Sequence, residues 1–189
     1  MLYNRVIKRL IDLFAAIGFV LIFWWLFLLI CLIILVTDGR PVLFKQKRIG
    51  QYGKVFYIYK FRTMVKNAEE IGPSSTYIDD HRITPIGAFL RKTSLDEIPQ
   101  VINLLCGNMS LVGYRPGVLD NYTKEDLCSE IFSVRPGITG YAQINGRSSL
   151  SIEEKRRWEK KYAEEISFST DLKILIKTVI VVLFKSNAY

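Results

Sequence analysis

The feature that most constrains this chain is an apolar run of 24 residues, Leu13 to Val36, that contains no charged side chain. As a helix, a run of this length is long enough to cross the hydrocarbon core of a bilayer. A cleaved signal peptide fits poorly, because the run exceeds an apolar signal core and no small-residue cleavage site follows it. We therefore predict a membrane-anchoring helix within residues 1–40 and a separate domain in residues 41–189.

Both flanks of the apolar run are basic. Positive residues favour the cytoplasmic side of a membrane, so both ends of the run have reason to stay inside. One solution is a re-entrant helix that enters one leaflet and returns, and a single straight span is the alternative. The flanking cations are Arg5, Lys8 and Arg9 before the run, and Arg40, Lys45, Lys47 and Arg48 after it.

Charge narrows the class of partner. The 189-residue chain has a formal net charge of +8, and its segment from Arg40 to Lys66 holds eight Lys or Arg residues and no acid. Apolar and aromatic residues lie among these cations, which suits a surface that binds anionic lipid headgroups or phosphates. Nucleic acid competes for such a surface. We expect no nucleic-acid partner, because the membrane anchor already accounts for the charge.

Cysteine and histidine usage excludes several kinds of site. The three cysteines are far apart and odd in number, which predicts a reducing compartment and no disulfide framework. A single histidine, His81, argues against a histidine-based metal site or a Ser-His-Asp triad.

The remaining pattern predicts an α/β fold that is mostly helical. It has an N-terminal membrane helix, re-entrant or spanning, a small cytosolic domain with little sheet, and amphipathic helices at the membrane surface. We read the two Arg-Pro-Gly triplets as turns, and Asn145-Gly146 as a hairpin turn. The expected elements are a strand at Val55–Phe61, helices at 88–92, about 95–105 and 153–166, and a helix at 171–185 on the membrane surface or packed on the anchor. A plain core helix is the alternative for this last segment.

Asp96 and Glu97 form an acidic pair within Ser94-Leu95-Asp96-Glu97-Ile98-Pro99-Gln100. One interpretation is structural, because Ser94 and Glu97 have the spacing of a capping box. The other is chemistry on a phosphate ester, in which cations neutralise the phosphate and a carboxylate acts as nucleophile or metal ligand. Asp96 would lie in a first helical turn, where the helix dipole favours the ionised carboxylate that a nucleophile needs.

Several phrases, in order, together resemble one family. They extend from Lys8-Arg9-Leu10-Ile11-Asp12 and Pro41-Val42-Leu43-Phe44, with Gln46, Arg48 and Gly50, through Lys60-Phe61-Arg62-Thr63-Met64 and the acidic-pair segment, to Gly113-Tyr114-Arg115-Pro116 and Val134-Arg135-Pro136-Gly137-Ile138-Thr139-Gly140, with Gln143, Asn145, Gly146 and Arg147. This pattern is similar to that of the bacterial sugar transferases, the small monotopic phosphoglycosyl transferases. The resemblance covers about residues 8–171. At this length we expect no multi-span extension of the kind that larger family members carry.

The resemblance implies a phosphoglycosyl transferase at the cytoplasmic face of the bacterial inner membrane. A phosphosugar would move from a UDP-sugar to polyprenol (undecaprenyl) phosphate with release of UMP, through a covalent aspartyl-phosphosugar intermediate. This step would begin glycoconjugate biosynthesis, with membrane lipids and downstream glycosyltransferases as further partners. Asp96 would be the nucleophile, and Glu97, with Asp96, would bind Mg²⁺. The expected substrate-binding residues are Lys60, Arg62, Arg91, Arg115, Arg135, Gln143 and Arg147.

The chain departs from the family pattern in two places, a residue pair in the membrane helix and a single residue before Arg115. The family's membrane helix usually carries Ser-Pro near its middle, where this chain has Trp24 and Trp25. Tyr114 stands where proline is more usual before the Arg-Pro pair.

Two rival functions stay open: a phosphodiesterase or nucleotide-sugar hydrolase that uses water as acceptor, and a non-catalytic membrane module that binds anionic lipid or a partner glycosyltransferase.

Overall fold

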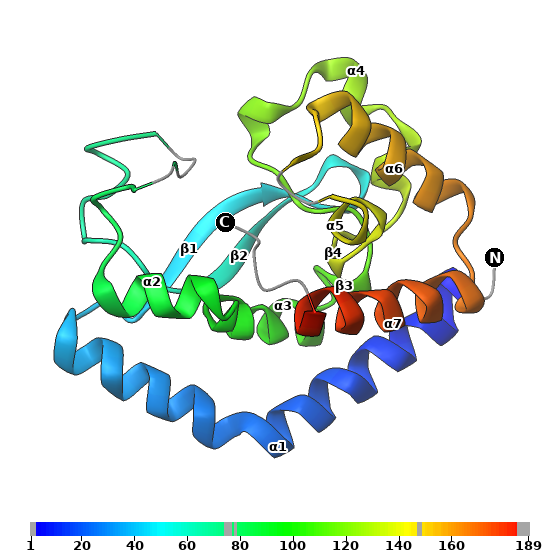
Figure 1. Ribbon diagram of the computed structural model, residues 1–189. Coiled ribbons are helices and arrows are strands. Elements are labelled where there is room, and N and C mark those ends of the chain that lie inside the picture. Colours follow the sequence, from blue (N-terminus) through cyan, green and yellow to red (C-terminus); the bar gives the residue numbers. More distant parts are fainter. Residues whose placement is uncertain (1–2, 74–76, 78, 147–148, 185–189) are drawn as a thin grey trace.

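The structure, a computed structural model, describes residues 3–73, 77, 79–146 and 149–184. It confirms the predicted fold class: a mostly helical α/β protein with one long N-terminal apolar helix and few strands (Figure 1). The helices are α1 (Lys8–Thr37), α2 (Pro85–Lys92), α3 (Val101–Cys106), α4 (Lys124–Leu127), α5 (Tyr141–Ile144), α6 (Ile152–Glu164) and α7 (Phe168–Phe184). The strands are β1 (Leu43–Ile49), β2 (Val55–Phe61), β3 (Ser110–Val112) and β4 (Gly137–Thr139).

The basic segment folds mainly into an antiparallel hairpin of β1 and β2, whose register pairs Leu43 with Phe61 and Ile49 with Val55. The predicted strand at Val55–Phe61 is confirmed. Because side chains alternate along a strand, Phe56 and Ile58 are buried on the same face that carries Lys60. The hairpin thus turns one apolar face, ending in a lysine, toward the rest of the domain.

Strands β3 and β4 form a separate parallel pair, which brings the two Arg-Pro-Gly triplets side by side through a bridge between Tyr114 and Pro136. Reading the second triplet as a turn was wrong, because Gly137 begins β4. Gly113 permits the close approach: a Cβ there would lie 2.2 Å from the carbonyl oxygen of Arg135. The Asn145-Gly146 hairpin was also wrong, because these residues follow helix α5 rather than a strand.

Helix α1 is bent near its middle, and both of its arms rise toward the same domain (Figure 1). In the first arm, Ala16 is buried against Phe56 and Ile58 of β2. In the second arm, Ile34 is buried against Phe61 at the other end of that strand. The intervening turns are largely exposed, including Trp24 and Trp25 at 58% and 52%.

Polar contacts fasten each end of α1 to the domain. Near the start, the Lys8 ammonium pairs with Asp171 of α7, and the Arg9 guanidinium donates to the carbonyls of Leu104 and Leu105. At the end, the Arg62 guanidinium donates to the carbonyl oxygens of Asp38 and Gly39, at 2.6 and 2.8 Å. Within the described residues, α1 is the one helix long and apolar enough to cross a membrane. Its two ends nevertheless lie on one body, which is the arrangement of the re-entrant alternative.

Helices α6 and α7 pack on the β3–β4 pair. Tyr162 of α6 and Ile174 of α7 are buried in one core with Val112, Tyr114 and Phe132. The helix predicted at 153–166 is confirmed as α6, with a capping box formed by Ser151 and Glu154. Helix α7 contacts the anchor through Asp171. Its other side exposes the apolar residues Leu172, Ile176, Val179, Ile180 and Val182.

Candidate active site

The acidic pair lies in a single 3₁₀ segment, Leu95–Gln100, that leads directly into α3. The predicted helix therefore exists and ends at Gly107, whose φ of 78° is one that glycine adopts readily. The capping box was wrong: Ser94 has a left-handed backbone (φ 57°), and its side chain makes no capping hydrogen bond. With no cap to explain it, the acidic pair is oriented by its contacts with other elements.

Asp96 is a buried carboxylate with a cation beside it: its Oδ2 lies 3.7 Å from the Lys60 ammonium. Burial raises the pKa of Asp96 and the charge of Glu97 adds to the rise, while Lys60, Arg91 and Arg115 oppose it. The net direction is upward, opposite to the effect expected of the helix dipole. A short 3₁₀ segment has few aligned peptide dipoles, so the loss of hydration outweighs them.

Glu97 behaves differently although it is the next residue. Its Oε1 accepts hydrogen bonds from the Lys60 ammonium at 2.7 Å and from the Arg115 guanidinium at 3.0 Å. Burial raises the pKa of Glu97, but Arg115 and Lys60 outweigh it and hold the pKa at about 2. Two adjacent carboxyls thus have pKa values displaced in opposite directions, a pattern typical of sites that assign different tasks to two acids.

Three elements bring the cations of this site together. Lys60 ends the inward face of β2, Arg115 follows β3, and Arg91 extends from α2 with its Nε donating to Thr63 at 2.8 Å. Because of this placement, the lysine and both arginines favour the ionised form of Asp96. The structure therefore groups these three predicted residues around the acidic pair.

The other predicted residues lie elsewhere. Arg62 is buried at the end of α1, where its bonds to two carbonyls favour a structural role. Arg135 is half-buried and, in the described part of the chain, makes no ion pair with either acid. Gln143 is buried in α5, and neither its amide oxygen nor its amide nitrogen has a hydrogen-bond partner. Arg147 lies outside the described residues.

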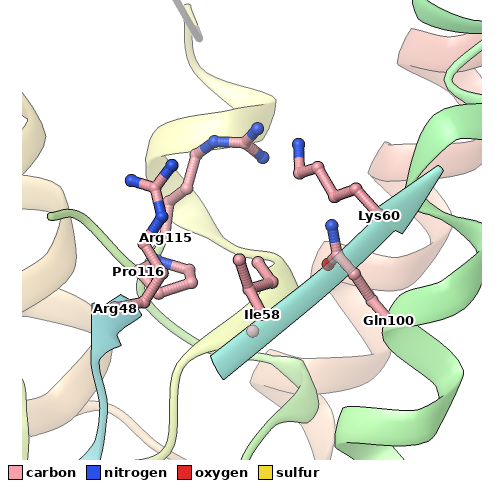
Figure 2. Close-up of a pocket in the computed structure, with 7 residues that line it drawn as sticks. Arg48, Ile58, Lys60, Gln100, Arg115 and Pro116 are labelled. Carbon is pink, nitrogen blue, oxygen red and sulfur yellow. The ribbon is translucent and has the colours of Figure 1, made fainter. Parts of the chain in front are cut away.

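A cavity beside the acidic pair identifies two residues that the sequence did not single out for substrate binding, Arg48 and Gln100 (Figure 2). Lys60 and Arg115 also line it. The available signal for Arg48 was the alternation of β1, in which Gln46 and Arg48 are less exposed than Lys45 and Lys47. That alternation becomes readable only once β1 is known to be a strand.

Asp96 and Glu97 are also the candidate metal ligands. Across the described residues, no group of three or more His, Cys, Asp or Glu side chains could hold a metal ion by itself. Two neighbouring carboxylates fit Mg²⁺, because this ion is commonly held by one or two carboxylates together with water and substrate phosphates. Both contacts that neutralise Glu97 use Oε1, so its second oxygen is the atom that could face a cation.

The family model described as "Bacterial sugar transferase" matches residues 3–185 of the chain. The chain belongs to the bacterial sugar transferase family. It is 42% identical over 177 residues to the "Uncharacterized sugar transferase EpsL" of Bacillus subtilis, covering 92% of this chain and 86% of that protein.

Larger relatives of this sugar transferase carry more specific names. The "Undecaprenyl-phosphate galactose phosphotransferase" of Salmonella typhimurium is 37% identical over 205 residues, or 98% of this chain and 42% of that protein. The "UDP-glucose:undecaprenyl-phosphate glucose-1-phosphate transferase" of Escherichia coli is 39% identical over 186 residues, or 93% of this chain and 40% of that protein. This chain therefore spans less than half the length of both larger relatives.

Proposed function

We propose that this sugar transferase moves a phosphosugar from a UDP-sugar to polyprenol (undecaprenyl) phosphate and releases UMP. The observation that carries the proposal is the buried Asp96 carboxylate, held 3.7 Å from the Lys60 ammonium beside a Glu97 that stays ionised. The names of the Salmonella and Escherichia coli relatives, which are undecaprenyl-phosphate sugar-phosphate transferases, support it.

The reaction takes place in two displacements at one phosphorus atom. A carboxylate oxygen of Asp96 bonds to the sugar-bearing phosphorus; the bond from that phosphorus to the bridging oxygen breaks, and UMP leaves with that oxygen. An oxygen of polyprenol phosphate then bonds to the same phosphorus, and the Asp96–phosphorus bond breaks. The carboxylate returns to its ionised state, and the product is a polyprenyl diphosphate sugar.

The surrounding side chains prepare Asp96 for this role. Its burial removes water that would otherwise solvate the carboxylate, and Lys60 supplies a positive charge beside it. Lys60 and Arg115 also face the substrate phosphates, whose charge would repel an anionic nucleophile. Glu97, with Asp96, would hold Mg²⁺, which when bound supplies further positive charge to the phosphate oxygens.

The membrane anchor fits a lipid acceptor. A phosphodiesterase with a soluble substrate and water as acceptor would have no need of α1, whose middle turns are exposed and apolar. We place the active site at the cytoplasmic face of the bacterial inner membrane, where UDP-sugars are made, with the apolar side of α7 against membrane lipids. Downstream glycosyltransferases would then extend the product in glycoconjugate biosynthesis.

Intact mass spectrometry tests the chemistry directly. The purified protein is mixed with a panel of UDP-sugars and Mg²⁺ without lipid acceptor. We expect a mass gain of one phosphosugar with the correct donor, no gain in Asp96→Asn because an amide is a poor nucleophile, and an unchanged gain in Glu164→Gln, an exposed acid of α6. Full turnover by Asp96→Asn once polyprenol phosphate is added would contradict the mechanism and favour a non-catalytic role for the acidic pair.

A further inference from the structure

The cavity beside the acidic pair has cations on two sides. Figure 2 shows Arg48, Arg115 and Pro116 along one wall, and Lys60 and Gln100 along the other, with Ile58 between them. The Lys60 ammonium and the Arg115 guanidinium extend toward each other across the opening, where both contact Glu97. Arg48 lies on the arginine wall, and in the described part of the chain it forms no ion pair with a carboxylate.

Arg48 is positioned by β1 and is half-buried. Its guanidinium donates to the side-chain oxygen of Gln46, which is uncharged. In the described part of the chain no carboxylate forms an ion pair with it, and its buried Nε lacks a hydrogen-bond partner. Burial and the nearby charge of Arg115 lower the pKa of Arg48, and the charges of Tyr122 and Glu97 only partly oppose this fall. Holding two guanidinium groups together in a partly dehydrated wall costs free energy that a bound anion would offset.

We propose that Arg48 and Arg115 form a binding subsite for the nucleotide's own phosphate, the group that leaves in UMP. This inference rests on the proposed function for the direction of the substrate. Asp96 and Lys60 lie together, so the phosphate under attack lies on their side of the cavity. The second phosphate of the same diphosphate then reaches the arginine wall, and Arg115 is shared between the two positions because it also contacts Glu97.

The choice of arginine suits a leaving phosphate. A planar guanidinium can bind two phosphate oxygens at once, which fixes orientation as well as charge. As the bond to the bridging oxygen breaks, negative charge grows on the departing UMP. An arginine at this position therefore binds UMP and also lowers the barrier to its departure.

The test measures anion binding to the full chain by calorimetry, with UMP and inorganic pyrophosphate as probes. In Arg48→Gln we expect affinity for both probes to fall about 10- to 100-fold, the loss that one charge-assisted hydrogen-bond pair produces. Arg48→Lys keeps the charge but not the two-pronged geometry, and we expect a smaller loss. Lys47→Gln, the exposed neighbour on the opposite face of β1, is the matched control and should bind like the wild type.

Thermal unfolding of each variant separates a binding loss from a folding defect, and Arg48→Lys is the variant to rely on if Arg48→Gln unfolds. Anion affinity in Arg48→Gln and Arg48→Lys equal to that of Lys47→Gln would overturn the subsite, as would a wild-type protein that binds neither anion.

The two proposals fail separately. If the wild-type chain forms the Asp96 adduct but UMP affinity does not depend on Arg48, the transferase proposal stands and the subsite proposal is wrong. If the chain forms no adduct but pyrophosphate affinity depends on Arg48, the subsite proposal stands and the transferase proposal is wrong.

Discussion

Lys60 is the cation that Asp96 and Glu97 share. It contacts Glu97 at 2.7 Å and lies 3.7 Å from Asp96, so one ammonium group favours the ionised form of both carboxyls. Glu97 retains a second cation, Arg115, at 3.0 Å. The closest cation to Asp96 that the ion pairs identify is Lys60 itself, and burial already raises the pKa of this carboxyl.

Replacing Lys60 with methionine should therefore change the pH dependence of the first displacement. In the proposed mechanism Asp96 attacks only when ionised, and the carboxyl is protonated below its pKa. Removing the cation raises that pKa further, so the acidic limb of the rate profile should move to higher pH. The rate of adduct formation in a single turnover, measured across pH, gives the position of the acidic limb, and Lys47→Met is the control. A limb that stays in place in Lys60→Met would show that Asp96 ionisation does not set it.

At the scale of elements, the position of Arg115 depends on how closely β3 and β4 approach. Gly113 lies directly before Tyr114 and Arg115, and its Cα faces the backbone of Arg135. The parallel pairing then fixes the direction in which the chain enters the active site. A side chain at Gly113 would separate the two strands and displace Arg115 with them.

Gly113→Ala should consequently destabilise the protein and reduce adduct formation together. The new Cβ would lie 2.2 Å from a backbone oxygen, which cannot move aside as a flexible side chain could. We expect a loss of about 1–3 kcal/mol in the free energy of unfolding, the usual cost of overpacking. Thermal or denaturant unfolding in detergent measures it. Gly18→Ala in α1, where a Cβ meets nothing within 4 Å, should cause no loss. Equal stability of the two variants would refute the close-packing argument.

For the whole molecule, we expect the bend in α1 to decide how the enzyme lies in the membrane. Its first arm is tied to α3 and α7, and its end to Arg62. A straight span would place the two ends on opposite sides of the bilayer and break one set of these contacts. The re-entrant form keeps the N-terminus, the hairpin and the active site on one side.

Cysteine labelling tests this topology. In a background without Cys31, Cys106 and Cys128, single cysteines are placed at Asn4 and at Glu164. A membrane-impermeant maleimide should label both only when the cytoplasmic face is accessible, as in inverted vesicles, because both positions lie on the side of the domain. Labelling of the Asn4 position from outside intact cells would show that α1 crosses the bilayer.

The sequence by itself determined the local features whose causes are local. The uncharged run of residues 13–36 predicts α1, and β-branched and aromatic residues predict β2. The charged pattern of 153–166 predicts α6. The sequence also identified the acidic pair Asp96–Glu97 as a candidate site. What the sequence could not predict also has a physical cause. Arg-Pro-Gly locally favours a turn, and pairing with the distant strand β3 overrides that preference where Gly137 begins β4.

The tertiary structure alone decided which charges meet. It directed Arg62 to the end of α1, gathered Lys60, Arg91 and Arg115 around Asp96, and added Arg48 to the same cavity. It also bent α1, whose sequence has no Ser-Pro, by burying each arm against a different end of the same strand. Burial and charge pairing depend on residues far apart in the chain, and these set the opposite pKa directions of Asp96 and Glu97.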